Sequence, residues 1–406
     1  MNVIFVEPAF PDNQHEFIRA LHAVGANVIG VGERPVDWLG ENLRQWITHY
    51  EQIDSVVDEA ALLNTVQRIQ SQLWVDRLEA TVEAHVLTTA RVREACGIPG
   101  TSVRTAWLCR DKPAMKEALR VAGIPCAQSI GANHPDEVRE FAARTGLPLI
   151  IKPRDGAGSA GTWRIDHSDE LESVIIASGL ADGRPVAVEE FVEGHEGYLD
   201  TLSIAGEPVH EFVTHYYPNV LEAMRTRWIS PQMVTTNQID APGYAEVRAM
   251  ARRVNRVMGI DTTATHMEWF FGPRGLKFSE IGCRPPGVCQ WDVYNAANEF
   301  DLYVEWANAI VHGRPIQKPS RKYACGMIAL RPDCDGQIIG YEGLDEIQSN
   351  FGEWIVASHL PAPGTATQPV EAGYMANAWI RIRHPDYDHL RWMMDAIGRS
   401  VQVKAG

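Results

Sequence analysis

The feature that most limits how this chain can fold is a glycine-rich stretch between two strand-like runs. Three glycines in residues 156–161 formally match the pattern G-x-G-x-x-G, and they follow the apolar run 149–153. A dinucleotide-binding turn with that pattern opens a helix, and a phosphate loop of the Walker type has a lysine after its last glycine. Residues 162–165 instead alternate like a strand, and Thr162 stands where that lysine would be. The segment therefore predicts a strand, a glycine loop and a second strand.

The residues around this loop suggest a use for it. Backbone N–H groups of a glycine-rich hairpin can cover phosphate groups, and Ser159 adds a hydroxyl. Lys152, at the start of the loop, is placed to pair with a phosphate as a point charge. The alternative is a surface hairpin with a solvated lysine, and the loop alone leaves both interpretations open.

The N-terminal region predicts a parallel sheet. Residues 3–6 form an apolar run, a helix from Asp12 or Asn13 ends near Gly25, and residues 27–31 form a second apolar run. A strand, a helix and a strand in this order are typical of an α/β domain. Further helices are predicted at 58–72, 83–96, 113–121, 136–145, 243–258 and 388–397, and further strands at 149–153, 185–192, 266–271 and 276–281.

Composition narrows the class of protein. The formal net charge of -15 argues against binding nucleic acid or anionic lipid through bulk charge, although a local basic pocket stays compatible with it. None of the seven cysteines forms a C-x-x-C pair, which excludes a visible zinc knuckle or dithiol motif and fits a reducing compartment. The first residues lack the features of a secretory signal, and no apolar stretch is long enough to span a bilayer. We therefore expect a cytoplasmic protein with no membrane partner.

An apolar strand that ends in acids is a second candidate site. Residues 186–192 contain Glu189 and Glu190, and Glu196 follows a few positions later. An extended backbone can offer a donor and an acceptor to an adenine, and a carboxylate can accept from the hydroxyls of a ribose. The alternative is a strand end whose acids face water.

A predicted hairpin brings two further acids together. Glu268 and Glu280 lie twelve positions apart across a turn at 272–275, so they can share one face of paired strands. Facing carboxylates repel unless a cation lies between them, and Mg²⁺ prefers oxygen ligands. A solvent-exposed pair is the alternative, but the apolar neighbours argue against it. Arg284 follows in a rigid Arg-Pro-Pro-Gly segment, where it can hold a phosphate or carboxylate bidentately or form a salt bridge with Glu280.

Taken in order, these segments resemble the ATP-grasp superfamily over most of the chain. The matching segments are Asp111-Lys112 with Met115-Lys116, Gly123-Ile124-Pro125, Ile151-Lys152-Pro153, the run 188–194 and the run 280–287. The resemblance implies a Rossmann-like domain at 1–105, an ATP-grasp domain at 106–318 with a flap subdomain at about 125–187, and a β-rich domain of the biotin-carboxylase-like branch at 319–406. The fold class is therefore expected to be α/β, with α+β character in the ATP-grasp part.

The resemblance also implies roles for matching positions. Lys112 and Lys152 would contact the phosphates of ATP, which the flap with Gly158 and Ser159 would cover. The adenine would meet Glu189 and the backbone of Glu190, Phe191 and Val192, and the ribose would meet Glu196. Mg²⁺ would be held by Glu268 and Glu280, and Arg284 would stabilise the transferring phosphoryl group or the acyl phosphate. One position departs from the pattern, because many members of the family have Asn where this chain has Gly282.

The implied activity is a ligase that activates a carboxylate as an acyl phosphate and joins it to an amine, releasing ADP and phosphate. We expect small-molecule carboxylate and amine partners, an amino acid among them, and a homodimer stays open. A carboxylase that uses bicarbonate would share every motif. A non-catalytic ATP sensor is the remaining alternative, and the presence of both Glu268 and Glu280 argues against it. Candidates for the acceptor site are His215, Arg225, Arg227, Trp228 and His266, although the two arginines also fit a solvated basic loop.

Overall fold

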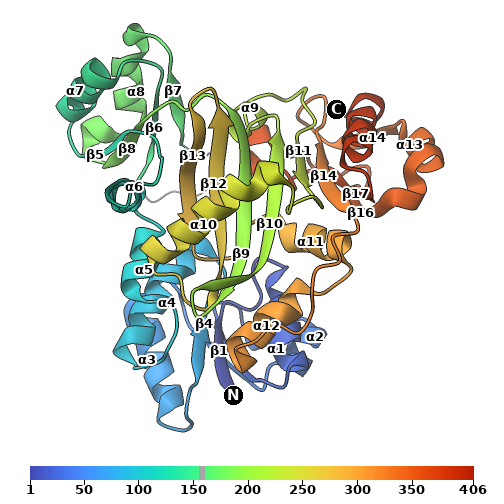
Figure 1. The fold of residues 1–406 in the computed structure, drawn as a ribbon. Helices are drawn as coiled ribbons and strands as arrows, with labels where there is room; N and C mark the ends of the chain where they lie inside the picture. Colours follow the sequence, from blue (N-terminus) through green and yellow to red (C-terminus); the bar gives the residue numbers. More distant parts are fainter. Residues whose placement is uncertain (155–160) are drawn as a thin grey trace.

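The N-terminal part of the computed structural model, which describes residues 1–154 and 161–406, is a parallel sheet flanked by helices (Figure 1). Its strands are β1 (Asn2–Val6), β2 (Asn27–Gly32), β3 (His49–Gln52) and β4 (Arg77–Glu79), and its helices are α1 (Gln14–Ala23), α2 (Glu41–Trp46), α3 (Glu59–Gln70), α4 (Glu83–Ala95) and α5 (Val103–Leu108). The strand order is β3-β2-β1-β4, and the pairs are parallel. The apolar residues of β1 are fully buried, as a strand covered on both faces requires. The predicted α/β opening is confirmed.

A small unit of four antiparallel strands follows, at the upper left of Figure 1. It contains α6 (Lys112–Val121), β5 (Ser129–Ala132), α7 (Pro135–Thr145), β6 (Leu149–Pro153), β7 (Trp163–Ile165), α8 (Leu171–Ala177) and β8 (Val186–Glu190). The sheet order is β5-β8-β6-β7. β6 and β7 pair antiparallel on either side of the glycine loop, as the sequence predicts. Gly158 and Ser159 lie outside the described residues.

The largest element is one antiparallel sheet of eight strands in the order β13-β12-β9-β10-β11-β14-β17-β16. Its first part contains β9 (His195–Ile204), β10 (Glu207–Tyr217), α9 (Val220–Ala223), β11 (Gln232–Thr235), α10 (Ala245–Met258), β12 (Thr263–Gly272), β13 (Gly275–Gly282), α11 (Gln290–Asn298) and α12 (Leu302–His312). The predicted hairpin is β12–β13. Helix α10 crosses one face of the sheet (Figure 1).

Three of the C-terminal strands extend this same sheet, and the other two form a separate two-stranded sheet. The C-terminal elements are β14 (Ala324–Leu330), β15 (Ile338–Glu342), α13 (Leu344–Phe351), β16 (Ile355–His359), β17 (Ala378–His384), α14 (Tyr387–Ser400) and β18 (Gln402–Ala405). The large sheet contains β14, β17 and β16, whereas β15 pairs with β18. β14 pairs with β11, so hydrogen bonds continue across the boundary expected at 318/319. The bounds of the three expected domains stay predictions. Among the described residues, no helix combines the length and the apolar character needed to cross a membrane.

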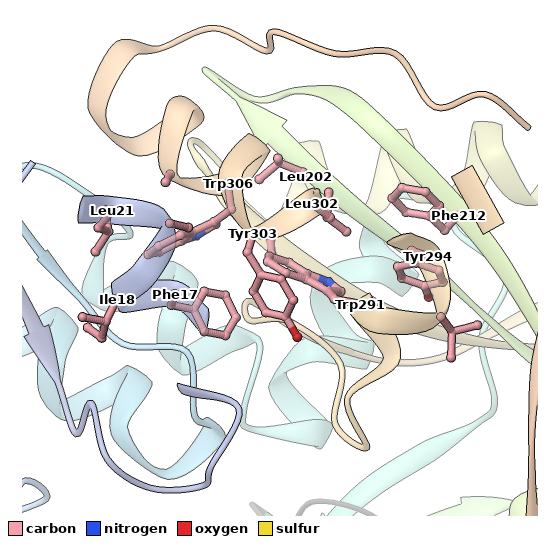
Figure 2. Close-up of a cluster of buried hydrophobic side chains, with 14 of the residues drawn as sticks. Phe17, Ile18, Leu21, Leu202, Phe212, Trp291, Tyr294, Leu302, Tyr303 and Trp306 are labelled. Atoms are coloured by element: carbon pink, nitrogen blue, oxygen red, sulfur yellow. The ribbon is translucent and has the colours of Figure 1, made fainter. Parts of the chain in front are cut away.

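An aromatic cluster joins the N-terminal sheet to the central sheet (Figure 2). Phe17 of α1 packs edge-on against Trp306 and Tyr303 of α12, with ring centroids 5.0 Å apart in both pairs. Tyr294 of α11 stacks on Phe212 of β10 at 4.2 Å. Because α12 contacts β1 through Trp306 and Phe5 and also packs on β9 and β12, the position of one sheet relative to the other depends on this buried packing.

Replacing Trp306, which is 2% exposed, by alanine should therefore destabilise the whole chain. We expect the free energy of unfolding to fall by about 3–5 kcal/mol, because a large buried ring is lost and a cavity is left. Urea unfolding followed by circular dichroism measures the change. Trp38→Ala is the control, since Trp38 is 75% exposed and should change stability by less than about 0.5 kcal/mol. Equal effects of the two substitutions would contradict this account of the core.

Candidate functional site

A cavity of about 420 Å³ lies where the small unit meets the central sheet. Its walls come from β6 and β8 on one side and from β9, α9 and the β12–β13 hairpin on the other. Of the residues proposed from the sequence, it is lined by Lys152, Glu189, Glu190, Phe191, Val192, Glu196, Arg225, Glu268 and Glu280. Most of the predicted site is therefore brought together, although the biochemical role of each residue stays a prediction.

Glu189 binds two lysines at the floor of this cavity. Its Oε2 lies 2.5 Å from Nζ of Lys116 and 3.1 Å from Nζ of Lys152. Burial would raise the pKa of Glu189, but the two lysines lower it to about 2. The carboxylate is therefore ionised and fixes both ammonium groups. A direct role at the adenine, as the resemblance implies, competes with these two ion pairs.

The sequence did not single out Lys116 as a site residue. It lies on α6 four positions after Lys112, so the two side chains share one face of the helix. Nζ of Lys112 lies 3.6 Å from Glu280 Oε2, and Nζ of Lys152 lies 3.8 Å from the same oxygen. The spacing of four residues between Lys112 and Lys116 was the signal in the sequence that could have indicated Lys116. The same spacing is also found in an ordinary amphipathic helix.

The end of β8 has a different use for each residue. Glu190 accepts from Lys277 Nζ at 2.8 Å and from Arg274 Nη1 at 3.1 Å, so its side chain is held against the β12–β13 hairpin. Phe191 donates its N–H to the carbonyl of Pro148 and accepts from Arg274 at its own carbonyl, at 3.1 Å each. A base that is recognised by backbone groups would therefore meet Val192 rather than Phe191.

Three carboxylates face the upper part of the cavity. Glu268 and Glu280 lie at an irregularity between the pairs Met267–Ile281 and Trp269–Phe278, and this brings both to the cavity wall. Glu196 is on the neighbouring strand β9, and its Oε2 accepts from the N–H of Val220 at 2.7 Å. Burial, followed by the charge of Glu268, raises the pKa of Glu196 to about 8.

The closeness of these three carboxylates bears on whether the residues suit a cation. Carboxylates that keep a neighbour protonated would be relieved by a divalent ion, and Glu268 and Glu280 supply the hard oxygen ligands that Mg²⁺ prefers. Among the described residues, no set of three or more His, Cys, Asp or Glu side chains is arranged to hold a metal by itself. The side chains therefore fit a cation that takes its other ligands from water or phosphate.

A second, smaller space of about 20 Å³ adjoins the first, and Glu280 lines both. Its wall also contains His266 and Arg284. Nε of Arg284 donates to Oε2 of Glu83 at 2.7 Å, so its partner is an acid from α4 of the N-terminal part rather than Glu280. The backbone of Gly282 is not left-handed, so its conformation does not require glycine. The Cβ atom of a larger residue would, however, lie 3.1 Å from the same Glu83 oxygen.

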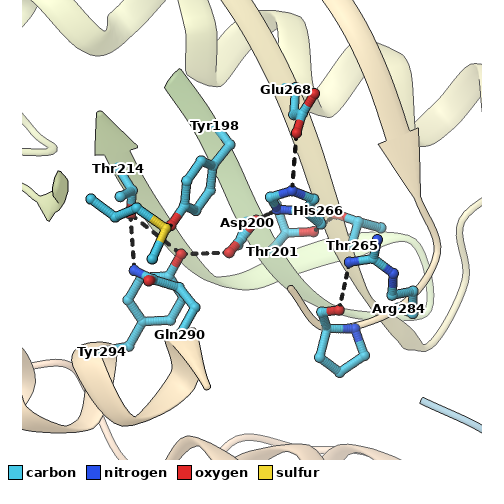
Figure 3. A network of polar contacts seen from close by, with 12 residues as sticks. Tyr198, Asp200, Thr201, Thr214, Thr265, His266, Glu268, Arg284, Gln290 and Tyr294 are labelled. Atoms are coloured by element: carbon cyan, nitrogen blue, oxygen red, sulfur yellow. Dashed lines mark hydrogen bonds and ion pairs between the residues drawn. The ribbon is translucent and has the colours of Figure 1, made fainter. Parts of the chain in front are cut away.

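His266 lines the smaller space and lies between Asp200 and Glu268 (Figure 3). Its Nδ1 donates to Oδ1 of Asp200 at 2.7 Å, and its Nε2 lies 3.6 Å from Oε1 of Glu268. Burial would lower the pKa of His266, but Asp200 and Glu268 raise it to about 9, so the ring is a cation at neutral pH. The small space therefore contains a guanidinium and an imidazolium.

Of the remaining candidates for the acceptor site, one lines the cavity and the others do not. Arg225 lines the cavity and donates to the carbonyl of Thr162 at 2.7 Å. Arg227 instead forms an ion pair with Asp335, and Trp228 is 88% exposed. His215 lies on the face of the central sheet opposite to the cavity. It is bonded to His195, and successive strand residues alternate, so His195 points away from the face on which its neighbour Glu196 lines the cavity. His215 is also bonded there to Tyr244. Expecting His215 and Arg227 in the acceptor site does not agree with these positions.

The raised pKa of Glu196 gives a testable pH dependence. Between about pH 4.5 and 8 the folded protein keeps a proton that the unfolded chain has lost, so Glu196 makes stability fall as pH rises through this window. Glu196→Gln should therefore raise the melting temperature of the protein without nucleotide or metal, and more at pH 8 than at pH 5. Calorimetry at both values measures this. Exposed Glu172→Gln is the control, and a loss of stability at pH 8 in Glu196→Gln would refute the assignment.

Comparisons with known proteins agree with this geometry. The family described as "ATP-grasp domain" matches residues 117–296. An L-arginine-specific L-amino acid ligase of Bacillus subtilis is 26% identical over 248 residues, covering 60% of this chain and 59% of the relative. Alanine--anticapsin ligase of Bacillus subtilis (strain 168) is 23% identical over 230 residues, covering 52% and 48%. The match thus spans about half of these curated relatives.

Solved structures share the fold along the whole chain. An L-amino acid ligase from Bacillus licheniformis has a TM-score of 0.78 at 16% identity, covering 100% of this chain and 98% of that one. N5-carboxyaminoimidazole ribonucleotide synthetase from Thermotoga maritima has a TM-score of 0.71 at 16% identity, covering 100% and 99%. At these identities the likeness concerns the fold alone. Residues 117–296 therefore match the ATP-grasp domain family, and the chain as a whole shares the fold of these solved structures.

Proposed function

We propose that this protein is an ATP-dependent carboxylate–amine ligase that works through an acyl phosphate and releases ADP and phosphate. The observation that carries the proposal is the pair of adjoining spaces that share Glu280. The larger has lysines and carboxylates, which suit a nucleoside triphosphate with its cation, and the smaller is lined by four basic side chains, His266 and Arg284 among them, which suit a carboxylate. The curated relatives named above are an L-amino acid ligase and an alanine--anticapsin ligase, and they support the same class of reaction.

ATP would occupy the larger cavity. Lys116 and Lys152, both held by Glu189, would meet the phosphates, with Lys112 next to them. Val192 would offer backbone groups to the adenine, and Glu196 a carboxyl group to the ribose. Glu268 and Glu280 would hold Mg²⁺, which supplies positive charge to the phosphates when it is bound.

The acceptor carboxylate would lie between Arg284 and His266. One of its oxygens attacks the γ-phosphorus of ATP, the bond from that phosphorus to the bridging oxygen breaks, and ADP leaves. The amine nitrogen then attacks the carbonyl carbon of the acyl phosphate, phosphate leaves with the bonding electrons, and the nitrogen loses a proton. Arg284 and His266 stabilise negative charge at the phosphoryl group in the first step, because they are already fixed by Glu83 and Asp200.

The finer expectations from the sequence remain part of this proposal. They are the amino acid as one substrate, magnesium, a cytoplasmic location and a homodimer. No observation on the described residues favours bicarbonate over an organic carboxylate, and a sensor would have no use for two acids at the phosphate end of the cavity.

The reaction products test the mechanism. Purified protein incubated with Mg²⁺, ATP and pools of amino acids should form ADP and phosphate only when both a carboxylate and an amine are present, and mass spectrometry should detect the amide. Omitting each component in turn is the control. AMP and pyrophosphate would indicate adenylation, and bicarbonate-dependent ADP formation without an amine product would indicate a carboxylase.

Arg284→Lys tests the contact at the acceptor carboxylate. Lysine keeps the charge but loses the planar fork, so we expect kcat/KM for the carboxylate to fall about 100-fold while the KM for ATP stays unchanged. Arg227→Lys is the matched control, because Arg227 pairs with Asp335 outside the cavity and its variant should retain normal kinetics. Full activity of Arg284→Lys would show that charge alone is needed at this position.

A further inference from the structure

A buried acid behind the small space contacts two separate parts of its wall. Asp200 of β9 is 2% exposed. Its Oδ1 accepts from Nδ1 of His266 at 2.7 Å, and its Oδ2 accepts a short hydrogen bond from the hydroxyl of Tyr294 (Figure 3). Both oxygens of one carboxylate are therefore used, one toward the β12 strand and one toward α11.

The first contact fixes the His266 ring. Asp200 and His266 are opposite each other in the antiparallel pairing of β9 with β12, so the strand register itself sets their distance. The ring of Tyr198 packs edge-on against the imidazole, with centroids 4.8 Å apart. With Nδ1 bonded behind the wall, Nε2 is directed toward Glu268, at the junction of the two spaces.

The second contact reaches the segment that carries Arg284. Between that arginine and α11, Val288 and Cys289 both adopt left-handed backbone, with φ of 52° and 50°. Such a conformation is strained in a β-branched residue and persists only when the surroundings hold it. Tyr294, on the first turns of α11, is held by the hydrogen bond to Asp200 and by its stack on Phe212. The strained turn is thus tied to the sheet one helical turn beyond its end.

We propose that Asp200 is a positioning residue of the acceptor-carboxylate site, one that aligns His266 directly and the turn bearing Arg284 through Tyr294. The inference rests on the proposed function, because it assigns Asp200 to the site where the carboxylate would bind. A buried carboxylate is costly to desolvate, and apolar residues would fill such a site at no loss of stability. Its two contacts instead reach His266 and, through Tyr294, the helix that follows the turn bearing Arg284.

Kinetics of Asp200→Asn separate positioning from general stability. Asparagine keeps the size of the side chain but removes the charge, so we expect the KM for the acceptor carboxylate to rise roughly tenfold or more, as for loss of a charged hydrogen bond, with the KM for ATP unchanged. Glu211→Gln is the matched control. Glu211 is also a buried strand acid, bonded to Arg248 and Arg252 away from both spaces, and its variant should keep both constants. An equal rise of both KM values in Asp200→Asn would overturn the proposal.

A double-mutant cycle tests whether Asp200 acts through His266. Both contacts of Asp200 must be removed for this test, so the cycle is made in Tyr294→Phe. His266→Gln should raise the carboxylate KM there, and adding Asp200→Asn should change that value by no more than about twofold. Multiplied effects would mean that Asp200 contributes independently of both His266 and Tyr294, which contradicts positioning.

A spectroscopic measurement makes the test independent of the reaction. The Nδ1 proton of His266, bonded to a carboxylate, should give a proton NMR signal downfield of the backbone amides, identified by its loss in His266→Gln. It should disappear in Asp200→Asn and remain in Glu211→Gln; an unchanged signal in Asp200→Asn would refute the alignment.

Tyr294→Phe serves if Asp200→Asn does not fold, since it removes only the hydroxyl. Its His266 signal should shift without being lost and its carboxylate KM should rise, whereas wild-type values for both would overturn the link through α11. If the unmodified protein cleaves ATP without needing a carboxylate, the proposed function fails, and the NMR results still decide whether Asp200 aligns His266.

Discussion

The charge balance at the base of the cavity is the constraint on which the rest of the site depends. Lys116 is almost completely buried, and a buried ammonium group is unfavourable unless an anion compensates it. Glu189 supplies that anion and binds Lys152 as well, while Glu280 takes up the remaining positive charge. Because β6, β8, α6 and β13 each contribute one of these charges, the small unit and the central sheet are held together by the groups that would bind phosphate. Stability and ligand binding are therefore coupled in this part of the molecule.

The second half of the site depends on packing between the N-terminal part and the central sheet. Glu83, the partner of Arg284, belongs to the N-terminal part, and the two residues are 201 positions apart in the chain. Their neighbours Val86 and Cys283 belong to one buried cluster, and the aromatic contact of α1 with α12 joins the same two parts elsewhere. The N-terminal part thus does more than precede the ATP-grasp domain, because it supplies the acid that orients a proposed substrate-binding arginine.

The sequence predicted those parts of the fold whose patterns are local. The β12–β13 hairpin was predictable because a glycine turn separates two alternating runs, and the parallel opening because its strands are wholly apolar. Strand β9 was not predicted, since nearly all of its residues are buried on both faces and no alternation marks it. Asp200 was missed because it lies in this unpredicted strand, and because a single acid within a strand usually faces water. The ion pair of Glu83 with Arg284 and the displacement of His215 to the other face both depend on strand register and tertiary packing, which spacing along the chain does not encode.

The pairing of β11 with β14 has a consequence for how the chain can be divided. Although the family resemblance implies a boundary near residue 318, a chain ended there would leave β11 with a row of unpaired backbone N–H and C=O groups. Exposed edges of this kind recruit strands from neighbouring molecules. The C-terminal segment therefore covers an otherwise exposed edge of the central sheet, and its loss would favour self-association of the fragment rather than a smaller domain that folds independently.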